Sequence, residues 1–363
     1  MKKGKIKYVF PGGNTPRGFY SFYHDGLKNM ERIFILKGGP GTGKSTLIRK
    51  VGLEMVERGF AVEFWQCSSD NDSLDGVIIP DFKIAIIDGT SPHMVDPKYP
   101  GVVEQLVNLG DHWDEKYLKS HKNVIKKLVD EISASFQDAY RQLNQAQKVY
   151  KAWKDINKAA MDFNKVNQKT ELLMQEIFSV HAPFVRHMFA SAITPRGLVN
   201  FINSITEDCK KRYILKGLPG TGKSTLIRKI AEGAVERGYQ ADFYHCALDP
   251  DTLDMVVIPQ LGIAVFDGSN PHLVEPERAG DTVINMMDAL DLEEVGQQKE
   301  KTEQLDGEFK QYLHEAIGKL AQAKKLHDQL EGFYIKAMDF EAVEHTGTQI
   351  FNKILSQMAK KEV

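Results

Sequence analysis

Short hydrophobic runs alternate with a longer amphipathic segment near the start of the chain. Four runs are rich in β-branched and aromatic residues, as is typical of buried strands, and they cover residues 7–10, 32–37, 62–67 and 83–88. Between the second and third runs, residues 45–59 place apolar side chains at helical spacing. This order predicts an α/β fold in which helices flank a parallel β-sheet.

A helical pattern follows from residue 101 onward. Residues 101–182 contain no proline, and apolar side chains recur every four residues at Val124, Leu128, Ile132, Phe136 and Tyr140. A similar stripe occurs later in the chain at Phe309, Leu313, Ile317 and Leu320. We therefore expect a long helical arm, folded as a hairpin, over about residues 101–182 and again over about residues 280–363.

The chain contains an internal repeat with an offset of 179 positions, which places Gly38 on Gly217. Residues 37–60 and 216–239 are identical at 17 of 24 positions, and a related motif at 158–163 returns at 336–340. Identity at this level indicates duplication. We expect two tandem domains, residues 1–182 and 183–363, each with its own helical arm and with a boundary near Pro183.

Composition and charge narrow the classes of partner. With 42% hydrophobic residues among 363, the chain is long enough for two or three compact domains. The formal net charge of −2 provides no chain-wide basic field, so nucleic acid is an unlikely partner. No apolar run approaches the roughly 20 residues of a membrane span, and the start lacks the apolar core of a signal peptide. We expect no membrane partner, a cytoplasmic location, and reduced thiols at Cys67, Cys209 and Cys246.

The two arms differ in charge. Residues 116–169 hold 12 Lys/Arg and 5 Asp/Glu, whereas the matching residues 293–346 hold 7 and 12. Opposite charges favour pairing of the arms. The alternative is that both arms expose solvated faces whose composition drifted apart, which explains the same numbers. A protein partner that binds through the arms is a further expectation.

Both repeats contain the motif G-x-x-x-x-G-K-[ST] directly after an apolar strand and before an amphipathic helix. Glycines let backbone N–H groups converge on a polyphosphate, and the helix N-terminus adds partial positive charge. The lysine reaches the β- and γ-phosphates, and the serine hydroxyl binds Mg²⁺. The expected nucleotide-binding residues are Gly38, Pro40, Gly41, Thr42, Gly43, Lys44, Ser45, Thr46, Gly217, Pro219, Gly220, Thr221, Gly222, Lys223, Ser224 and Thr225.

An aspartate ends an apolar strand 44 residues after each of these lysines, at Asp88 and Asp267. This resembles a Walker B strand, in which the carboxylate helps to hold the metal. The expected metal ligands are therefore Ser45, Asp88, Ser224 and Asp267.

Together these motifs resemble the P-loop NTPase superfamily and, within it, a bacterial family of tandem-duplicated P-loop ATPases. The resemblance rests on residues 10–100 and 189–279. It implies binding of ATP or GTP with Mg²⁺ and usually hydrolysis. ATP is favoured because no Asn-Lys-x-Asp guanine motif occurs. The chain departs from fast ATPases because Gly, not Glu, follows Asp88 and Asp267, and it has no ABC-transporter signature.

Other recurrent residues have open roles. His93 and His272 follow the Asp-ended strands by five residues, where they would orient water, sense the γ-phosphate, hold a substrate or only bond to backbone. Cys67 and Cys246 precede acidic clusters, which fits either a Zn²⁺ site or buried thiols beside capping acids.

Arg17 and Arg196 occupy Thr-Pro-Arg-Gly turns. They fit either of two roles, an arginine finger that stabilises charge in the transition state or an exposed residue of the turn.

Three functions follow from these features. The leading hypothesis is an ATPase, with Lys44, Lys223, Asp88, Asp267, His93 and His272 as catalytic residues, whose two sites drive rearrangement of the two halves. The second is a nucleotide or small-molecule kinase, with the loop from Asp70 to Asp75 and His93 forming the acceptor site. The third is a nucleotide-gated scaffold that binds a protein or nucleic acid through the basic arm.

Overall fold

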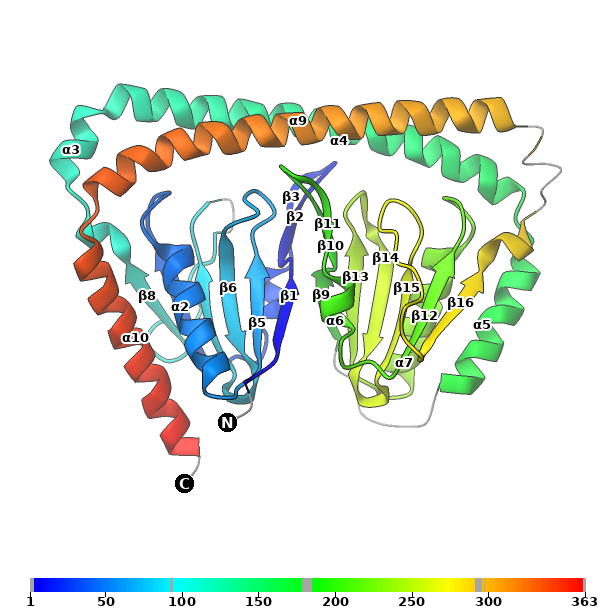
Figure 1. The fold of residues 1–363 in the computed structure, drawn as a ribbon, viewed down its shortest axis with the longest axis horizontal. Coiled ribbons are helices and arrows are strands. Elements are labelled where there is room, and N and C mark those ends of the chain that lie inside the picture. The colour runs from blue at the N-terminus through cyan, green and yellow to red at the C-terminus, as the bar shows by residue number, and fades with distance from the viewer. Residues whose placement is uncertain (1–2, 92–93, 178–184, 291–295, 297, 362–363) are drawn as a thin grey trace. The chain divides into compact units, whose positions relative to one another are not determined.

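The computed structural model describes residues 3–91, 94–177, 185–290, 296 and 298–361 (Figure 1). Internal contacts divide the chain into two compact units. Unit 1 comprises Met1–Gly12, Tyr23–Gln137 and Lys319–Val363, and unit 2 comprises Gly13–Phe22 and Asp138–Gly318. The expected boundary near Pro183 lies outside the described residues. It separates the two repeats of the sequence. By contacts, each unit instead combines the sheet of one repeat with part of the arm of the other.

Unit 1 is built on a six-stranded sheet with the order β1-β5-β6-β7-β4-β8. These strands are β1 (Ile6–Val9), β4 (Arg32–Lys37), β5 (Val62–Gln66), β6 (Leu74–Ile79), β7 (Ile84–Asp88) and β8 (Glu104–Asn108). Helix α2 (Lys44–Glu57) packs against β6 and β5. The four predicted strands and the predicted helix are therefore confirmed.

The expectation of a parallel sheet is wrong for one strand. β6 pairs antiparallel with both β5 and β7, so the sheet is mixed. The connections explain this, because residues 67–73 and 80–83 are too short for the crossover of about a dozen residues that parallel neighbours need. β6 is also missing from the predicted strands, since Asp75 and Gly76 interrupt its apolar run.

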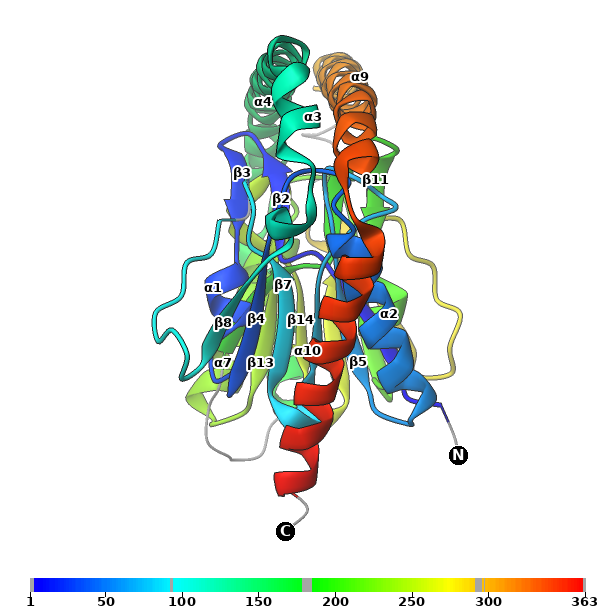
Figure 2. The ribbon, with the colours of Figure 1, turned by 90° about the vertical axis from the view of Figure 1, so that its left-hand side faces the viewer.

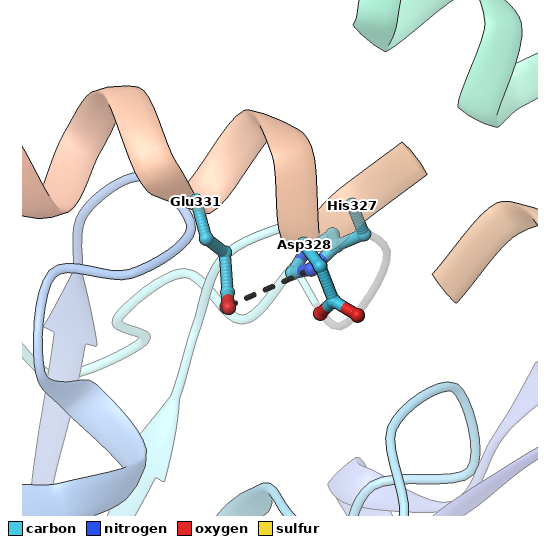
Figure 3. Close-up of side chains that lie close together, drawn as sticks. All are labelled: His327, Asp328 and Glu331. Carbon is cyan, nitrogen blue, oxygen red and sulfur yellow. Dashed lines mark ion pairs between the residues drawn. The ribbon is translucent and has the colours of Figure 1, made fainter. Parts of the chain in front are cut away.

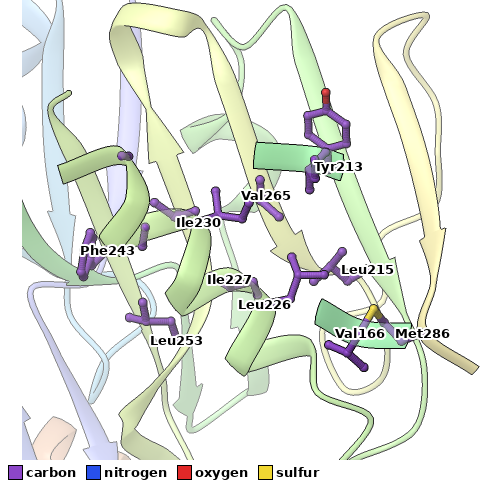
Figure 4. Close-up of a cluster of buried hydrophobic side chains, with 14 of the residues drawn as sticks. Val166, Tyr213, Leu215, Leu226, Ile227, Ile230, Phe243, Leu253, Val265 and Met286 are labelled. Atoms are coloured by element: carbon purple, nitrogen blue, oxygen red, sulfur yellow. The ribbon is translucent and has the colours of Figure 1, made fainter. Parts of the chain in front are cut away.

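Unit 2 repeats this topology, with the order β16-β12-β15-β14-β13-β9. Its strands are β9 (Val185–Phe189), β12 (Lys211–Lys216), β13 (Ala241–Cys246), β14 (Asp249–Ile258), β15 (Ile263–Asp267) and β16 (Asp281–Asn285). β14 is antiparallel to both neighbours, as β6 is in unit 1. Helix α7 (Lys223–Glu236) packs on β14, and its apolar face forms the core drawn in Figure 4.

Shorter elements join these strands. Two hairpins, β2 (Gly12–Thr15) with β3 (Gly18–Ser21) and β10 (Ser191–Thr194) with β11 (Gly197–Asn200), form small two-stranded sheets. The remaining short helices are α1 (Tyr23–Gly26), η1 (Pro80–Phe82), η2 (Leu109–His112), α3 (Glu115–Ser120), α6 (Ile202–Ile205), η3 (Pro259–Leu261) and η4 (Met286–Ala289).

The arms are long helices, and the hairpin expected within each arm is wrong. The first arm is α4 (Lys122–Ala159) followed by α5 (Phe163–Ile177), and the second is α9 (Lys299–Ala337) followed by α10 (Phe340–Lys361). α4 begins in unit 1 and ends in unit 2, while α9 runs from unit 2 into unit 1. Among the described residues, no helix is both long and apolar enough to cross a membrane.

The two arms pack against each other within each unit. In unit 2 the rings of Tyr150 and Phe309 lie 5.3 Å apart, and in unit 1 the rings of His121 and Phe333 lie 5.1 Å apart. These contacts are aromatic, so packing of rings contributes to the interface between the arms.

The end of each arm completes the core of the other repeat. In unit 1, Val343, Ile350 and Ile354 of α10 join the buried cluster between α2 and the sheet, and α10 lies beside α2 (Figure 2). In unit 2, Val166 and Leu173 of α5 join the equivalent cluster with α7 (Figure 4). Each sheet therefore depends on a helix encoded in the other half of the chain.

Ile354→Ala should lower the free energy of unfolding of unit 1 by about 2 to 5 kcal/mol, because this side chain is fully buried in the core. Urea unfolding followed by tryptophan fluorescence, to which the buried Trp65 of unit 1 contributes, measures the change. Leu53→Ala is the matched control because Leu53 on α2 is 44% exposed, and it should have a small effect. Equal losses in both variants would show that α10 does not belong to this core.

Candidate functional site

The two glycine-rich loops have the same backbone geometry. Loop 1 (residues 38–43) connects β4 to α2, and loop 2 (residues 217–222) connects β12 to α7. Gly41 and Gly43 have φ of 71° and 88°, and Gly220 and Gly222 have φ of 88° and 83°. These values lie in the left-handed region, which glycine adopts without the steric penalty of a side chain. The motif therefore has a structural reason for its glycines in both repeats.

In unit 1 the structure brings Lys44 and Asp88 together at loop 1. The Lys44 Nζ donates hydrogen bonds to the carbonyl oxygens of Gly38 (3.0 Å) and Gly39 (2.7 Å). It also lies 3.6 Å from Asp88 Oδ2, and the Lys44 side chain is only 9% exposed. A buried ammonium group is thus held between the loop and the carboxylate that ends β7.

Unit 2 repeats this arrangement. The Lys223 Nζ donates to the carbonyl oxygens of Gly217 (2.5 Å) and Leu218 (2.8 Å), and it lies 3.5 Å from Asp267 Oδ2. Burial lowers the pKa of Lys223, although the charge of Asp267 opposes this effect. Burial also raises the pKa of Asp267, against the charge of Lys223. Burial therefore disfavours the charged form of each group, and the charge of its neighbour offsets this effect.

Each serine of the motif is tied to the neighbouring antiparallel strand. The Ser45 Oγ accepts a hydrogen bond from the backbone N–H of Leu74 (2.9 Å), and the Ser224 Oγ accepts one from that of Leu253 (3.3 Å). The residue that follows on each strand is a largely buried aspartate, Asp75 in unit 1 and Asp254 in unit 2. In unit 2 this second carboxylate is close enough to Lys223 and Asp267 for its charge to affect the pKa of both. The sequence shows these acids only as members of acidic clusters, because β6 is not recognised as a strand.

His272 lies beside this second carboxylate in unit 2. Its Nε2 is 3.0 Å from Asp254 Oδ2, and the side chain is 6% exposed. Burial lowers the pKa of His272, but the interaction with Asp254 and the charge of Asp267 outweigh burial, so the pKa is raised. The structure therefore places this predicted residue at the site of repeat 2. His93 lies outside the described residues.

The arm of repeat 1 touches loop 2. The Asn157 Nδ2 donates a hydrogen bond to the carbonyl oxygen of Pro219 (2.5 Å). A Cβ atom added at Gly220 would lie 3.0 Å from Lys154 Cα, and one at Gly222 would lie 3.4 Å from Val166. Glycine at position 220 therefore also allows a close approach between α4 and the loop.

The arm of repeat 2 touches loop 1 in the same way. A Cβ atom at Gly41 would lie 3.0 Å from the carbonyl oxygen of Glu331, and one at Gly43 would lie 3.4 Å from Val343. Nothing in the sequence near either loop indicates these contacts, because they join residues more than 50 positions apart. The only sequence signal is the repeated motif at 158–163 and 336–340. It lies shortly after Asn157 in the first arm and shortly after Glu331 in the second.

The cysteines are poorly suited to a Zn²⁺ site. Cys67 and Cys246 are free and buried. Burial raises the pKa of both thiols, and the nearby Asp75 and Asp254 raise them further. Since Zn²⁺ binds the thiolate, a thiol that holds its proton is a weak ligand.

A different group of possible metal ligands lies on α9, at His327, Asp328 and Glu331 (Figure 3). The His327 Nδ1 is 3.6 Å from a carboxylate oxygen of Glu331. Lys324 forms an ion pair with Asp328 and lies 3.2 Å from Asp70 Oδ2. Lys324 thus already pairs with Asp328, which makes Asp328 part of an ion-pair network.

Arg17 belongs to repeat 1 in the sequence and to unit 2 by contacts. Its guanidinium forms an ion pair with Asp251 of β14, and both side chains are largely exposed. The carboxylate of Asp251 therefore already pairs with the guanidinium group that an arginine finger would direct toward a phosphate. Arg196 closes its own turn, where its backbone N–H donates to Thr194 Oγ1 (3.2 Å).

Stability should depend on the protonation of His272. The folded protein holds this proton more tightly than the unfolded chain, whose histidine pKa is near 6.5. The contribution is therefore fully present below about pH 6.5 and lost as pH rises through the higher pKa of the folded state. Urea unfolding between about pH 6 and 8 should show this fall in the wild type and not in His272→Asn. The exposed His24 is the control, and His24→Asn should keep the fall. An unchanged pH profile in His272→Asn would contradict the assigned interaction.

Comparisons with known proteins identify no relative. No family model, no curated protein and no solved structure matches the chain. The function must therefore be inferred from the residues and the geometry of the site.

Proposed function

We propose that this chain is a Mg²⁺-dependent P-loop ATPase with one ATP site in each repeat. The observation that carries the proposal is the recurrence of one arrangement in both units. A glycine-rich loop with left-handed glycines leads into a helix whose first residue is a buried lysine, and the aspartate that ends a neighbouring strand lies within 3.6 Å of its ammonium group. A turn that only connects a strand to a helix needs neither the lysine nor the aspartate.

Backbone N–H groups of a glycine-rich loop and of the first turn of a helix suit the anionic oxygens of a triphosphate. The ammonium groups of Lys44 and Lys223, which now bond to carbonyl oxygens of their own loops, would bond to the β- and γ-phosphates. Ser45 with Asp88, and Ser224 with Asp267, would hold Mg²⁺, which neutralises charge on the phosphates when bound.

Fast ATPases carry a glutamate directly after the Walker B aspartate, and repeat 2 has Gly268 at that position. His272 is our candidate for the role that this glutamate leaves unfilled. Its raised pKa makes the imidazolium form more populated at neutral pH, and a cation donates hydrogen bonds without accepting a proton. We therefore assign it to stabilising charge on the γ-phosphate or orienting water, with Asp254 fixing its ring. General base catalysis by His272 is disfavoured by the same shift.

Contacts between the arms and the loops favour coupling of ATP binding to movement of the arms. Asn157 bonds to loop 2 and Glu331 packs on loop 1, so a loop that rearranges around phosphate also changes its contact with an arm. This supports the ATPase with coupled halves over the kinase, which requires an acceptor site. A scaffold gated by nucleotide uses the same contacts without turnover, and phosphate release from the purified protein separates the two.

Lys44→Ala and Lys223→Ala should each remove one ATP site, because the charge of a largely buried ammonium is lost from the phosphates. Affinity at the altered site should fall at least about tenfold. Calorimetric titration with Mg²⁺ and ATP should give two sites in the wild type and in the control Lys126→Ala, whose lysine is exposed on α4. Each variant should retain one site. Two undiminished sites in either variant would rule out the assignment.

Asp88→Asn and Asp267→Asn should keep most of the affinity for ATP measured without metal and lose the gain that Mg²⁺ provides. The reason is that the carboxylate acts on the nucleotide through the coordination shell of the ion. Titrations with and without Mg²⁺ measure this gain at one site at a time. Asp88→Asn is made in the Lys223→Ala protein, and Asp267→Asn in the Lys44→Ala protein. The exposed Asp81 on η1 is the matched control, and Asp81→Asn should leave the gain intact. A variant at Asp88 or Asp267 with the full Mg²⁺ effect argues that metal is held elsewhere.

A further inference from the structure

The arms present equivalent faces to the two glycine-rich loops. An offset of 177 positions relates the two arms around the repeated Met-Asp-Phe segment. This offset pairs Tyr150 with His327, Lys154 with Glu331, Asn157 with Tyr334, and Met161 with Met338. Within α4 and α9 the first three residues of each set are spaced by four and three, which places them on one face of the helix as one stripe.

The contacts confirm that Lys154 and Glu331 occupy the same place. In unit 2 the backbone of Lys154 packs on Gly220, and in unit 1 the backbone of Glu331 packs on Gly41. Gly220 and Gly41 are equivalent positions of the two loops. One arm therefore brings a lysine to a glycine-rich loop where the other arm brings a glutamate.

The surroundings of Lys154 leave its charge available to a ligand. Its Nζ lies 4.0 Å from Asp249 Oδ2, at the limit of an ion pair, and 5.7 Å from the centre of the Tyr150 ring. Its side chain is 31% exposed. It is also close enough to Lys223 for its charge to lower the pKa of that lysine, although burial contributes more. Two ammonium groups near one loop repel each other and would be stabilised by a bound polyanion.

The surroundings of Glu331 have the opposite effect. The Glu331 side chain is 25% exposed and lies 3.6 Å from His327, whose pKa is lowered by burial. His327 is therefore mostly neutral at pH 7, so it adds little positive charge beside Glu331. A carboxylate next to loop 1 repels the phosphates that the loop is built to bind.

We propose that Lys154 is a phosphate-binding residue that the arm of repeat 1 contributes to the nucleotide site of repeat 2, and that Glu331 weakens the site of repeat 1. This inference rests on the proposed nucleotide sites and deepens them. It makes the two sites unequal although their loops are nearly identical in sequence. The loop 2 site then holds ATP at concentrations at which the loop 1 site is largely empty.

Single-site proteins test the inequality directly. Lys44→Ala leaves only the loop 2 site, and Lys223→Ala leaves only the loop 1 site. Calorimetric titration with Mg²⁺ and ATP should show about tenfold tighter binding in the Lys44→Ala protein, as expected for a charged hydrogen bond to phosphate. Equal affinities, or tighter binding at loop 1, would overturn the proposal.

Substitutions of the two arm residues identify the cause. In the Lys44→Ala protein, Lys154→Ala should weaken ATP binding about tenfold, Lys154→Arg should restore most of it, and Lys148→Ala should change little because Lys148 is exposed on the same helix. In the Lys223→Ala protein, Glu331→Lys should tighten binding. The loss at Lys154→Ala should shrink as salt is raised, which a purely structural role would not produce.

The charge swap is the decisive variant. Lys154→Glu with Glu331→Lys should reverse the order of the two affinities, and thermal unfolding shows whether each protein is folded. If the single-site proteins bind ATP and the swap leaves the order unchanged, the role of Lys154 is refuted while the nucleotide sites stand. If neither single-site protein nor the wild type binds ATP or GTP, the proposed function itself fails and the inference with it.

Discussion

Burial of apolar surface between each sheet and the last helix of the opposite arm is the constraint on which the rest of this structure depends. Without α10, the cluster of α2 and the sheet of unit 1 would lose the side chains of Val343, Ile350 and Ile354. The same holds for unit 2 and α5. Because neither repeat closes its own core, each arm must run from one unit into the other. The long helices α4 and α9 follow from this requirement.

The exchange of arms also determines what surrounds the candidate sites. A helix that completes a core at its far end passes the glycine-rich loop on its way, so Lys154 and Asn157 come to lie against loop 2. Each candidate site thus combines a loop, a lysine and an aspartate from one repeat with a helical stripe from the other. Duplication made the loops alike, whereas the stripes diverged, and the difference between Lys154 and Glu331 lies in the part that diverged.

The parts of the fold that follow from local pattern could be predicted from the sequence. Strand Arg32–Lys37 and helix α2, for example, have an apolar periodicity that predicts a strand and a helix. The spacing of Lys44 and Asp88 predicts that their side chains lie close together, once the two strands are assumed to share a sheet. Strand β6 could not be predicted, because Asp75 and Gly76 hide its pattern and the short connections that reverse its direction become visible only when it is recognised. The exchange of arms was also out of reach, because an apolar stripe does not say which apolar surface covers it.

Hydrogen exchange on the Lys44→Ala protein tests most directly the central claim that each nucleotide site includes the arm of the other repeat. Amide exchange is compared with and without Mg²⁺ and ATP. The account predicts that residues 217–222 of loop 2 and residues 150–161 of α4 gain protection together, although they belong to different repeats. Protection of loop 2 with no change in α4 would contradict the claim, and so would protection confined to regions outside both segments.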